Sequence, residues 1–246
     1  MKKICICGGG ALGHVAAGYI AARSKAEVRV LTNHPERWSR SISVHTPEGE
    51  SLIGSLSMIS SSAKDVVTGA DVLLFCLPGF LIKEELEKVK PYLGTDAYVG
   101  TVFSSTGFFF EALKILSPEQ PLWGFQRVPF ISRVVEYGHS ANLLGYKSGF
   151  NIAVEHVSDV EKSQFADWVA DAFGRPVHLL RNYLEASLTN SNPILHTSRL
   201  YTLFSDWYEG VRYPSQFAFY DTWDVASAQR LIRMDKEFFD LLDVLP

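Results

Sequence analysis

The sequence lacks three features that would each assign it to a particular class of protein. It has no apolar run near the about 18 residues that a membrane-spanning helix needs, and its first residues lead into a strand rather than a cleavable signal. Its net charge of -4 excludes the basic stripe on which nucleic-acid binding depends. It holds only 3 cysteines, Cys5, Cys7 and Cys76, all in apolar runs, which argues against a disulfide framework or a metal site. We therefore expect a cytoplasmic protein that has no nucleic-acid or membrane partner.

A glycine-rich turn follows the first apolar run of the chain. Residues 4–7 read as a strand and residues 11–22 as a helix of small and apolar residues. Between them, the first glycine of a GxGxxG motif lets the chain turn, the second leaves room for a diphosphate, and the third lets the helix approach the strand. The helix end adds unpaired N–H groups. The predicted phosphate cradle consists of Gly8, Gly10, Ala11, Leu12 and Gly13.

The end of the second predicted strand favours one nicotinamide cofactor over the other. Residues 27–31 (EVRVL) predict this strand, and Thr32 and Asn33 follow it. An NAD site places a carboxylate here to bind the ribose 2′-hydroxyl, whereas this chain has neutral groups, with Arg37 and Arg40 just beyond. Guanidinium groups suit a 2′-phosphate. We therefore predict NADP, with NAD as the alternative.

The remaining pattern predicts an α/β fold with an N-terminal Rossmann domain and a short C-terminal all-helical domain. Residues 71–77 form an almost continuous apolar run, as expected of a parallel strand covered on both faces. Leu77 and Pro78 end it, where the nicotinamide half of a cofactor would lie. Further strands are predicted over 97–103, 122–128, 140–144, 150–154 and 176–180, and helices over 81–93 and 160–173. We predict a doubly wound, mainly parallel sheet in residues 1–181 and a substrate and dimerisation domain in residues 182–246.

The helical part contains the candidate catalytic residues. Asn192 and Pro193 predict the end of one helix and the start of another. His196 then lies one turn beyond Asn192 on the same face, with Arg199 further along. His196 is either a structural histidine or a proton donor to a group that hydride reduces. A donor would need a carboxylate partner, for which the candidates are Asp206, Glu209, Asp221 and Asp224. Arg199 is the candidate ligand of a substrate carboxylate.

Taken together, these segments resemble the octopine/nopaline (opine) dehydrogenase family of the 6-phosphogluconate dehydrogenase-like superfamily. The resemblance rests on the glycine motif, Leu77-Pro78, residues 147–154, Asn192-Pro-Ile-Leu-His196, Phe219-Tyr220 and Asp235-Lys236-Glu237. It implies NAD(P)H-dependent reduction of the imine that an amino acid forms with a 2-oxo acid, with His196 as the catalytic histidine and Asn192 beside it. Members of the family usually carry a longer helical domain.

Two other interpretations stay open at this stage. One is a 2-oxo acid reductase like ketopantoate reductase, which resembles a different pattern with a catalytic lysine at the start of the helical domain, whereas this chain has no lysine between Lys162 and Lys236. The other is a dinucleotide-binding sensor without turnover. A homodimer is a further hypothesis, because the C-terminal part is rich in aromatic residues, namely Phe217, Phe219, Tyr220, Trp223, Phe238 and Phe239.

Overall fold

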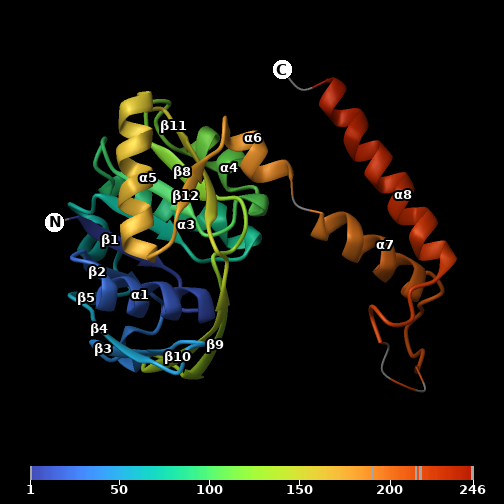
Figure 1. Cartoon of the computed structure of the whole chain (residues 1–246), viewed down its shortest axis with the longest axis horizontal. Coiled ribbons are helices and arrows are strands. Elements are labelled where there is room, and N and C mark those ends of the chain that lie inside the picture. Colours follow the sequence, from blue (N-terminus) through green and yellow to red (C-terminus); the bar gives the residue numbers. More distant parts are fainter. Residues whose placement is uncertain (1, 190, 214, 216–217, 245–246) are drawn as a thin grey trace. The chain divides into compact units, whose positions relative to one another are not determined.

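The main sheet of the protein is doubly wound and almost entirely parallel. The computed structural model describes residues 2–189, 191–213, 215 and 218–244, and the chain divides into two compact units, Met1–Thr189 and Asn190–Pro246. The sheet of the first unit has the strand order β12-β11-β8-β7-β6-β1-β2-β5 (Figure 1). Its strands are β1 (Lys3–Cys7), β2 (Glu27–Leu31), β5 (Met58–Ser60), β6 (Val72–Phe75), β7 (Tyr98–Thr101), β8 (Leu122–Phe125), β11 (Phe150–Glu155) and β12 (Val177–Leu179). Only the pair β11 and β8 is antiparallel. The predicted fold class is thereby confirmed.

Helices cover both faces of this sheet, and each face has its own hydrophobic core. The helices are α1 (Ala11–Arg23), α2 (Ala63–Val67), α3 (Gly79–Val89), α4 (Phe108–Ile115), α5 (Asp159–Phe173) and α6 (Tyr183–Leu188). Strand β1 shows the arrangement: Ile4 and Ile6 belong to the core beneath α1 and α5, and Cys5 and Cys7 to the core on the opposite face. Successive side chains of a strand point to opposite faces, so a strand covered on both sides is apolar throughout.

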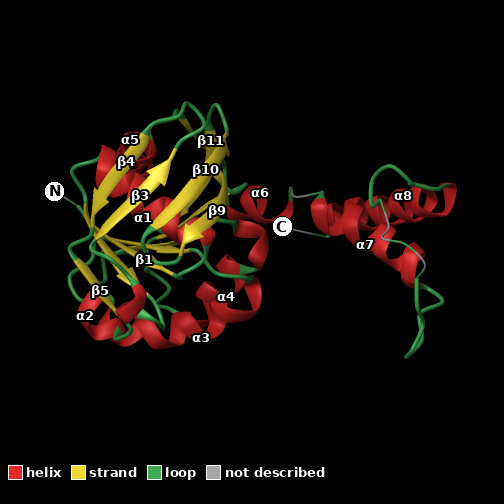
Figure 2. Ribbon diagram, turned by 90° about the horizontal axis from the view of Figure 1, so that it is seen from below, coloured by secondary structure: helices red, strands yellow, loops and turns green. Residues whose placement is uncertain are grey.

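A second, smaller sheet packs on the outer side of α1 (Figure 2). It has the order β4-β3-β10-β9 and is formed by β3 (Ser41–His45), β4 (Ser51–Ser55), β9 (Phe130–Glu136) and β10 (Ser140–Tyr146). A Cβ built on Gly18 of α1 would lie 2.6 Å from Val44 Cγ2, and one built on Gly54 of β4 would lie 2.4 Å from the Gly18 carbonyl oxygen. The helix therefore approaches this sheet as closely as backbone allows.

Several of these elements differ from the sequence prediction. The pattern predicted a strand over 140–144 but did not reveal that it pairs with β3, almost a hundred positions earlier, in a separate sheet. Strands β3, β4, β5 and β9 were not predicted from the sequence. Strand β1 has β2 on one side and β6 on the other. The chain continues from β1 to β2, so the switch point of the main sheet lies between β1 and β6. Ligands of open α/β sheets bind outside the strand ends at such a point.

The described residues of the second unit include the α-helices α7 (Asn192–Phe204) and α8 (Val225–Asp240), which pack against each other. Ser191 is the N-cap of α7, so Asn192 is its first helical residue rather than its cap. The domain boundary expected near residue 181 and the observed division after Thr189 differ by α6, which packs against β8 and β11 of the first unit. Short 3₁₀ turns occur at Pro35–Arg37, Lys90–Tyr92, Ser104–Thr106 and Leu241–Asp243. Across the described parts of the chain, no helix is long and apolar enough to span a membrane.

Candidate functional site

Packing requires two of the three motif glycines. Gly8 leaves β1 with a φ of +123°, a conformation that side chains rarely adopt, and a Cβ there would lie 2.7 Å from the Cys76 carbonyl oxygen. A Cβ on Gly13 would lie only 2.0 Å from the Gly8 carbonyl oxygen. The turn at the end of β1 and the close approach of α1 thus both require glycine, which has no side chain.

The middle glycine of the motif differs, because its side-chain position is open. Gly10 is the N-cap of α1, and a Cβ built on it would have no atom within 4 Å. No side chain caps the helix, and its first turn, which begins with Ala11 and Leu12, contains no acidic residue. Exposed N–H groups at an uncapped helix N-terminus attract anions. These residues therefore fit a diphosphate, which would lie where the Gly10 side chain is absent.

A cavity of ≈ 130 Å³ lies beside this loop, at the switch point of the sheet. Four residues predicted from the sequence line it, namely Gly8, Thr32, Asn33 and Leu77. Gly10, Ala11, Leu12, Gly13, Arg37 and Pro78 lie outside its lining, and Pro78 instead is the N-cap of α3. The lining that sequence reasoning missed is Gly9, Leu31, Leu81, Glu84, Glu85 and Lys88. Leu81, Glu84, Glu85 and Lys88 belong to α3. The helical pattern of this segment predicts a helix but not which part of the fold each of its faces contacts.

The turn between β9 and β10 reaches the glycine loop from the second sheet. The Tyr137 hydroxyl lies 3.4 Å from Thr32 Oγ1, and a Cβ on Gly9 would lie 2.6 Å from the same hydroxyl. Arg37 is exposed, and its guanidinium carbon lies 4.5 Å from the centre of the Tyr137 ring. The aromatic ring thus holds this cation near the end of β2.

A buried histidine joins this turn to the glycine loop. His14 Nδ1 lies 2.9 Å from the Gly10 carbonyl oxygen, and the Gly138 backbone N–H donates to His14 Nε2 over 2.7 Å. Because Nε2 accepts, the proton of the neutral ring must be on Nδ1, from which it is donated to Gly10. Burial lowers the pKa of His14 below its ordinary value of 6.5, although the bond to Gly10 opposes this. His14 is therefore a neutral structural clamp.

The second unit contains the candidate catalytic histidine. His196 is half-buried in α7, with Asn192 one helical turn before it. Its Nε2 lies 3.2 Å from the Tyr220 hydroxyl, and the Phe219 ring stands edge-on at 5.3 Å between centroids. In the described residues, this ring forms a hydrogen bond with a phenol, whereas we expected a proton donor to need a carboxylate partner.

Arg199, the candidate ligand of a substrate carboxylate, is buried within the second unit. Only 1% of it is exposed, and its guanidinium donates to the Thr222 carbonyl oxygen over 2.5 Å, to Ser227 Oγ over 3.0 Å and to Asp224 Oδ2 over 3.1 Å. Asp224, a candidate partner of His196, is the N-cap of α8, and its pKa is held below its usual range first by the Ser227 backbone N–H and also by Arg199. Arg199 therefore fastens α7 to the start of α8.

The cysteines provide neither a metal site nor a reactive thiol. All three are free and buried, and burial raises the pKa of Cys76 to about 12. Cys5 and Cys7 have sulfur atoms 3.9 Å apart inside the core. The described residues contain no group of three potential ligands that could hold a metal ion.

Comparison with known proteins relates this geometry to two groups of reductases. The family model of ketopantoate reductase PanE/ApbA matches residues 4–104. Octopine dehydrogenase from Pecten maximus is 26% identical over 266 residues, which cover 99% of this chain and 64% of that protein. Tauropine dehydrogenase from Arabella iricolor is 26% identical over 225 residues, covering 84% of this chain and 56% of that protein.

Solved structures give the same result. The structure of octopine dehydrogenase with NADH and L-arginine matches with a TM-score of 0.86 and 25% identity, over 99% of this chain and 64% of that one. A PanE/ApbA family ketopantoate reductase from Ralstonia eutropha JMP134 matches with a TM-score of 0.63 and 21% identity, over 80% of this chain and 61% of that one, and shares the fold. The chain thus spans less than two thirds of the length of these relatives. Its match to the octopine and tauropine enzymes runs through both units, so the chain is similar to opine dehydrogenases over most of its length.

Proposed function

We propose that the protein is an NAD(P)H-dependent oxidoreductase of the opine dehydrogenase type. It would reduce the imine formed by an amino acid and a 2-oxo acid, or the carbonyl of a 2-oxo acid. The observation that carries the proposal is the open position at Gly10 beside the uncapped N-terminus of α1, at the switch point of the sheet. The names of its relatives and the NADH, L-arginine and pyruvate in octopine dehydrogenase structures support the same chemistry.

The cofactor in this proposal is NADP(H) in preference to NAD(H). Arg37 stacks on Tyr137 close to Thr32, where the adenosine ribose of a bound dinucleotide would lie. Glu85 lines the same cavity, but Lys88 Nζ lies 3.3 Å from its carboxylate and offsets its charge. A 2′-phosphate would therefore meet a guanidinium held by an aromatic ring.

His196 is the proton donor in this mechanism. A nicotinamide cofactor, when bound, would supply the hydride that reduces a C=N or C=O carbon, and the nitrogen or oxygen of that bond would then need a proton. The Tyr220 hydroxyl at Nε2 would orient the imidazole, and Asn192 would hold the reacting group from the same face of α7. Because Arg199 donates its hydrogen bonds to Asp224 and Ser227 at the start of α8, we propose that it positions α7 and does not bind a substrate carboxylate.

The decisive test is NADPH oxidation with 2-oxo acids, measured with and without amino acids. Turnover that requires both substrates supports the proposal. His196→Ala should then lower kcat by about 10²- to 10⁴-fold and leave the affinity for NADPH largely unchanged. Binding of NADPH without turnover on any pair would favour the sensor hypothesis and contradict the proposal.

A simple 2-oxo acid reductase is the second candidate. The match of residues 4–104 to the ketopantoate reductase model favours it. Turnover with the oxo acid alone, unchanged by added amino acids, would select this function. A cytoplasmic location is part of the proposal in either case, since Cys5, Cys7 and Cys76 are buried as free thiols.

We also propose that the second unit forms a homodimer. In its described residues, the buried side chains are Ser198, Arg199 and Ser227, which are all polar. Aromatic side chains of α7 and of the residues that follow it are exposed, as are Val225, Ile232 and Phe239, spaced seven apart along α8. The exposed fractions of these aromatic residues are 57% for Tyr201, 38% for Phe204, 61% for Trp207 and 64% for Tyr208. Phe217, named in the dimer hypothesis, lies outside the described residues.

Two such helical pairs could bury these faces as a four-helix bundle. The proposal predicts a dimeric mass by sedimentation at micromolar concentration and a monomeric one for Ile232→Glu. A monomer for the unaltered chain would contradict it.

A further inference from the structure

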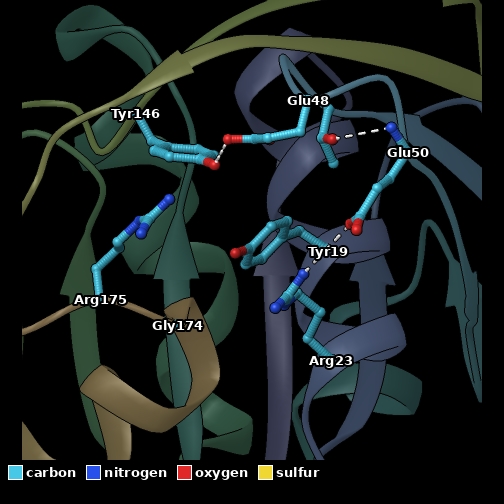
Figure 3. A pocket seen from close by; sticks show the side chains of 8 residues that line it. Tyr19, Arg23, Glu48, Glu50, Tyr146, Gly174 and Arg175 are labelled. Atoms are coloured by element: carbon cyan, nitrogen blue, oxygen red, sulfur yellow. Dashed lines mark hydrogen bonds and ion pairs between the residues drawn. The ribbon is translucent and has the colours of Figure 1, made fainter.

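A second pocket lies in the first unit, far from the glycine loop. It has a volume of ≈ 200 Å³ and lies at the C-terminal end of α1, whereas the glycine loop lies at the N-terminal end, about 18 Å away along the helix axis. Its lining comes from four places in the chain: Tyr19 and Arg23 of α1, the turn between β3 and β4, Tyr146 of β10, and the residues after α5. Figure 3 shows these side chains around a common space.

Backbone hydrogen bonds hold the walls of this pocket in place. The turn after β3 is closed by the Gly49 N–H, which donates to the Thr46 carbonyl oxygen over 3.0 Å, and by the Thr46 N–H, which donates to the Glu50 carbonyl oxygen over 2.9 Å. Gly174 ends α5 with a φ of +64°, and the Arg175 N–H donates to the Ala170 carbonyl oxygen over 3.2 Å. The pocket is therefore formed by the fold and not by loose side chains.

One cation of the pocket, Arg175, forms no ion pair in the described part of the chain, although the pKa of the Glu48 carboxyl is lowered first by the hydrogen bond from Tyr146 and also by the charge of Arg175. The guanidinium carbon of Arg175 lies 3.9 Å from the centre of the Tyr146 ring. Its Nε is buried without a hydrogen-bond partner, and none of the described carboxylates forms an ion pair with it. Tyr19 is only 4% exposed, and its hydroxyl, for which the described residues provide no hydrogen bond, points into the pocket (Figure 3). Together these groups could bind an anion, since a guanidinium and a hydroxyl both donate to a carboxylate.

The opposite wall has negative charge. Glu48 accepts a hydrogen bond from the Tyr146 hydroxyl, and Glu50 lies 3.8 Å from Arg23 Nη1 in an exposed ion pair. An exposed pair at this distance is weak, so the Glu50 carboxylate can exchange partners at little cost. Two carboxylates facing an unpaired guanidinium across a small space match a ligand that has both an ammonium and a carboxylate group.

We propose that this pocket binds a zwitterionic α-amino acid. The carboxylate is held by Arg175 and the Tyr19 hydroxyl, and the ammonium group by Glu48 and Glu50. The volume suits a small ligand, because it lies below the about 300 Å³ at which drug-sized sites begin. The site is separate from the proposed cofactor-binding glycine loop, which lies at the other end of α1.

Calorimetric titration of the full chain with L-alanine, propionate and ethylamine tests the proposal, because the two analogues each lack one charged group. L-Alanine should bind most tightly, and each analogue should bind at least about tenfold more weakly. Propionate that binds as tightly as L-alanine would make the pocket a plain anion site and overturn the proposal. No binding of L-alanine at millimolar concentration would also overturn it.

Variants assign the binding to this pocket rather than to the active site. Arg175→Gln should abolish binding of L-alanine, and Tyr19→Phe, which keeps the buried ring, should weaken it by about tenfold. Arg233→Gln, an exposed arginine of α8, is the matched control and should bind normally. His196→Ala should also bind normally. If His196→Ala loses the signal and Arg175→Gln keeps it, the amino acid binds at the proposed catalytic site and this pocket has no such role.

Discussion

Substitution of Gly10 by alanine should separate cofactor binding from folding. The residue has a φ of −82°, which alanine adopts readily, and a Cβ there would have no atom within 4 Å. An added methyl group therefore costs the folded chain little, and we expect the free energy of unfolding to change by less than about 1 kcal/mol. A diphosphate at the end of α1, by contrast, would have to share its space with this methyl group.

Gly13→Ala is the matched comparison within the same motif. Its Cβ would lie 2.0 Å from the Gly8 carbonyl oxygen, a backbone atom that cannot rotate away. Overpacking of this kind costs about 1–3 kcal/mol, which exceeds the about 1 kcal/mol that alanine gains over glycine inside a helix. Because the contact is so short, we expect the upper end of that range and a net loss of stability.

The two variants are measured by urea unfolding and by fluorescence titration with NADPH and NADH. For Gly10→Ala we expect a normal unfolding midpoint and a Kd raised at least about tenfold, equivalent to about 1.4 kcal/mol. Gly13→Ala should unfold at lower urea concentration. Wild-type affinity in a folded Gly10→Ala protein would refute the argument that a diphosphate lies against this residue.

Three further outcomes follow from the site. The stability that neutral His14 contributes should be fully present above about pH 6.5 and should be lost as the pH falls from 6.5 toward the lower pKa of the folded state. The urea midpoint should therefore decrease over this pH range, and His14→Gln should make that decrease smaller. Arg199→Met should destabilise the second unit by about 2 kcal/mol or more, seen as faster limited proteolysis within α7 and α8, while equal digestion would contradict the clamp. Arg37→Gln should raise the Kd for NADPH by about tenfold or more and leave that for NADH unchanged; an equal effect on both would remove the 2′-phosphate assignment.

The core of the main sheet could be predicted from the sequence because its signals are local. Glycine spacing and an apolar run are properties of neighbouring residues, and the predicted second strand, residues 27–31, coincides with β2. Strands β3, β4 and β9 gave no such signal, because they pair across long separations and only one of their faces is buried. Their register depends on contacts with α1 that no local pattern specifies.

The candidate site shows the same division. Gly8 and Gly13 could be assigned from spacing alone, since Gly8 needs a positive φ to leave its strand and Gly13 faces the Gly8 carbonyl oxygen of the same strand-turn-helix. The burial of Arg199 depends on Asp224 and Ser227, more than twenty positions away, so its hydrogen-bond partners could not be predicted from the sequence. The pairing of His196 with Tyr220 was equally hidden.

By itself, the sequence determined a glycine cradle between a buried parallel strand and the helix that follows it, because backbone sterics and strand burial act over a few residues. Only the tertiary structure decided which side chains surround that cradle. Tyr137 and His14 meet beside it, and Glu85 lines its cavity, because a second sheet and α3 are packed there by contacts between distant segments. Such contacts minimise exposed apolar surface over the whole fold, and this global condition leaves little trace in any single stretch of sequence.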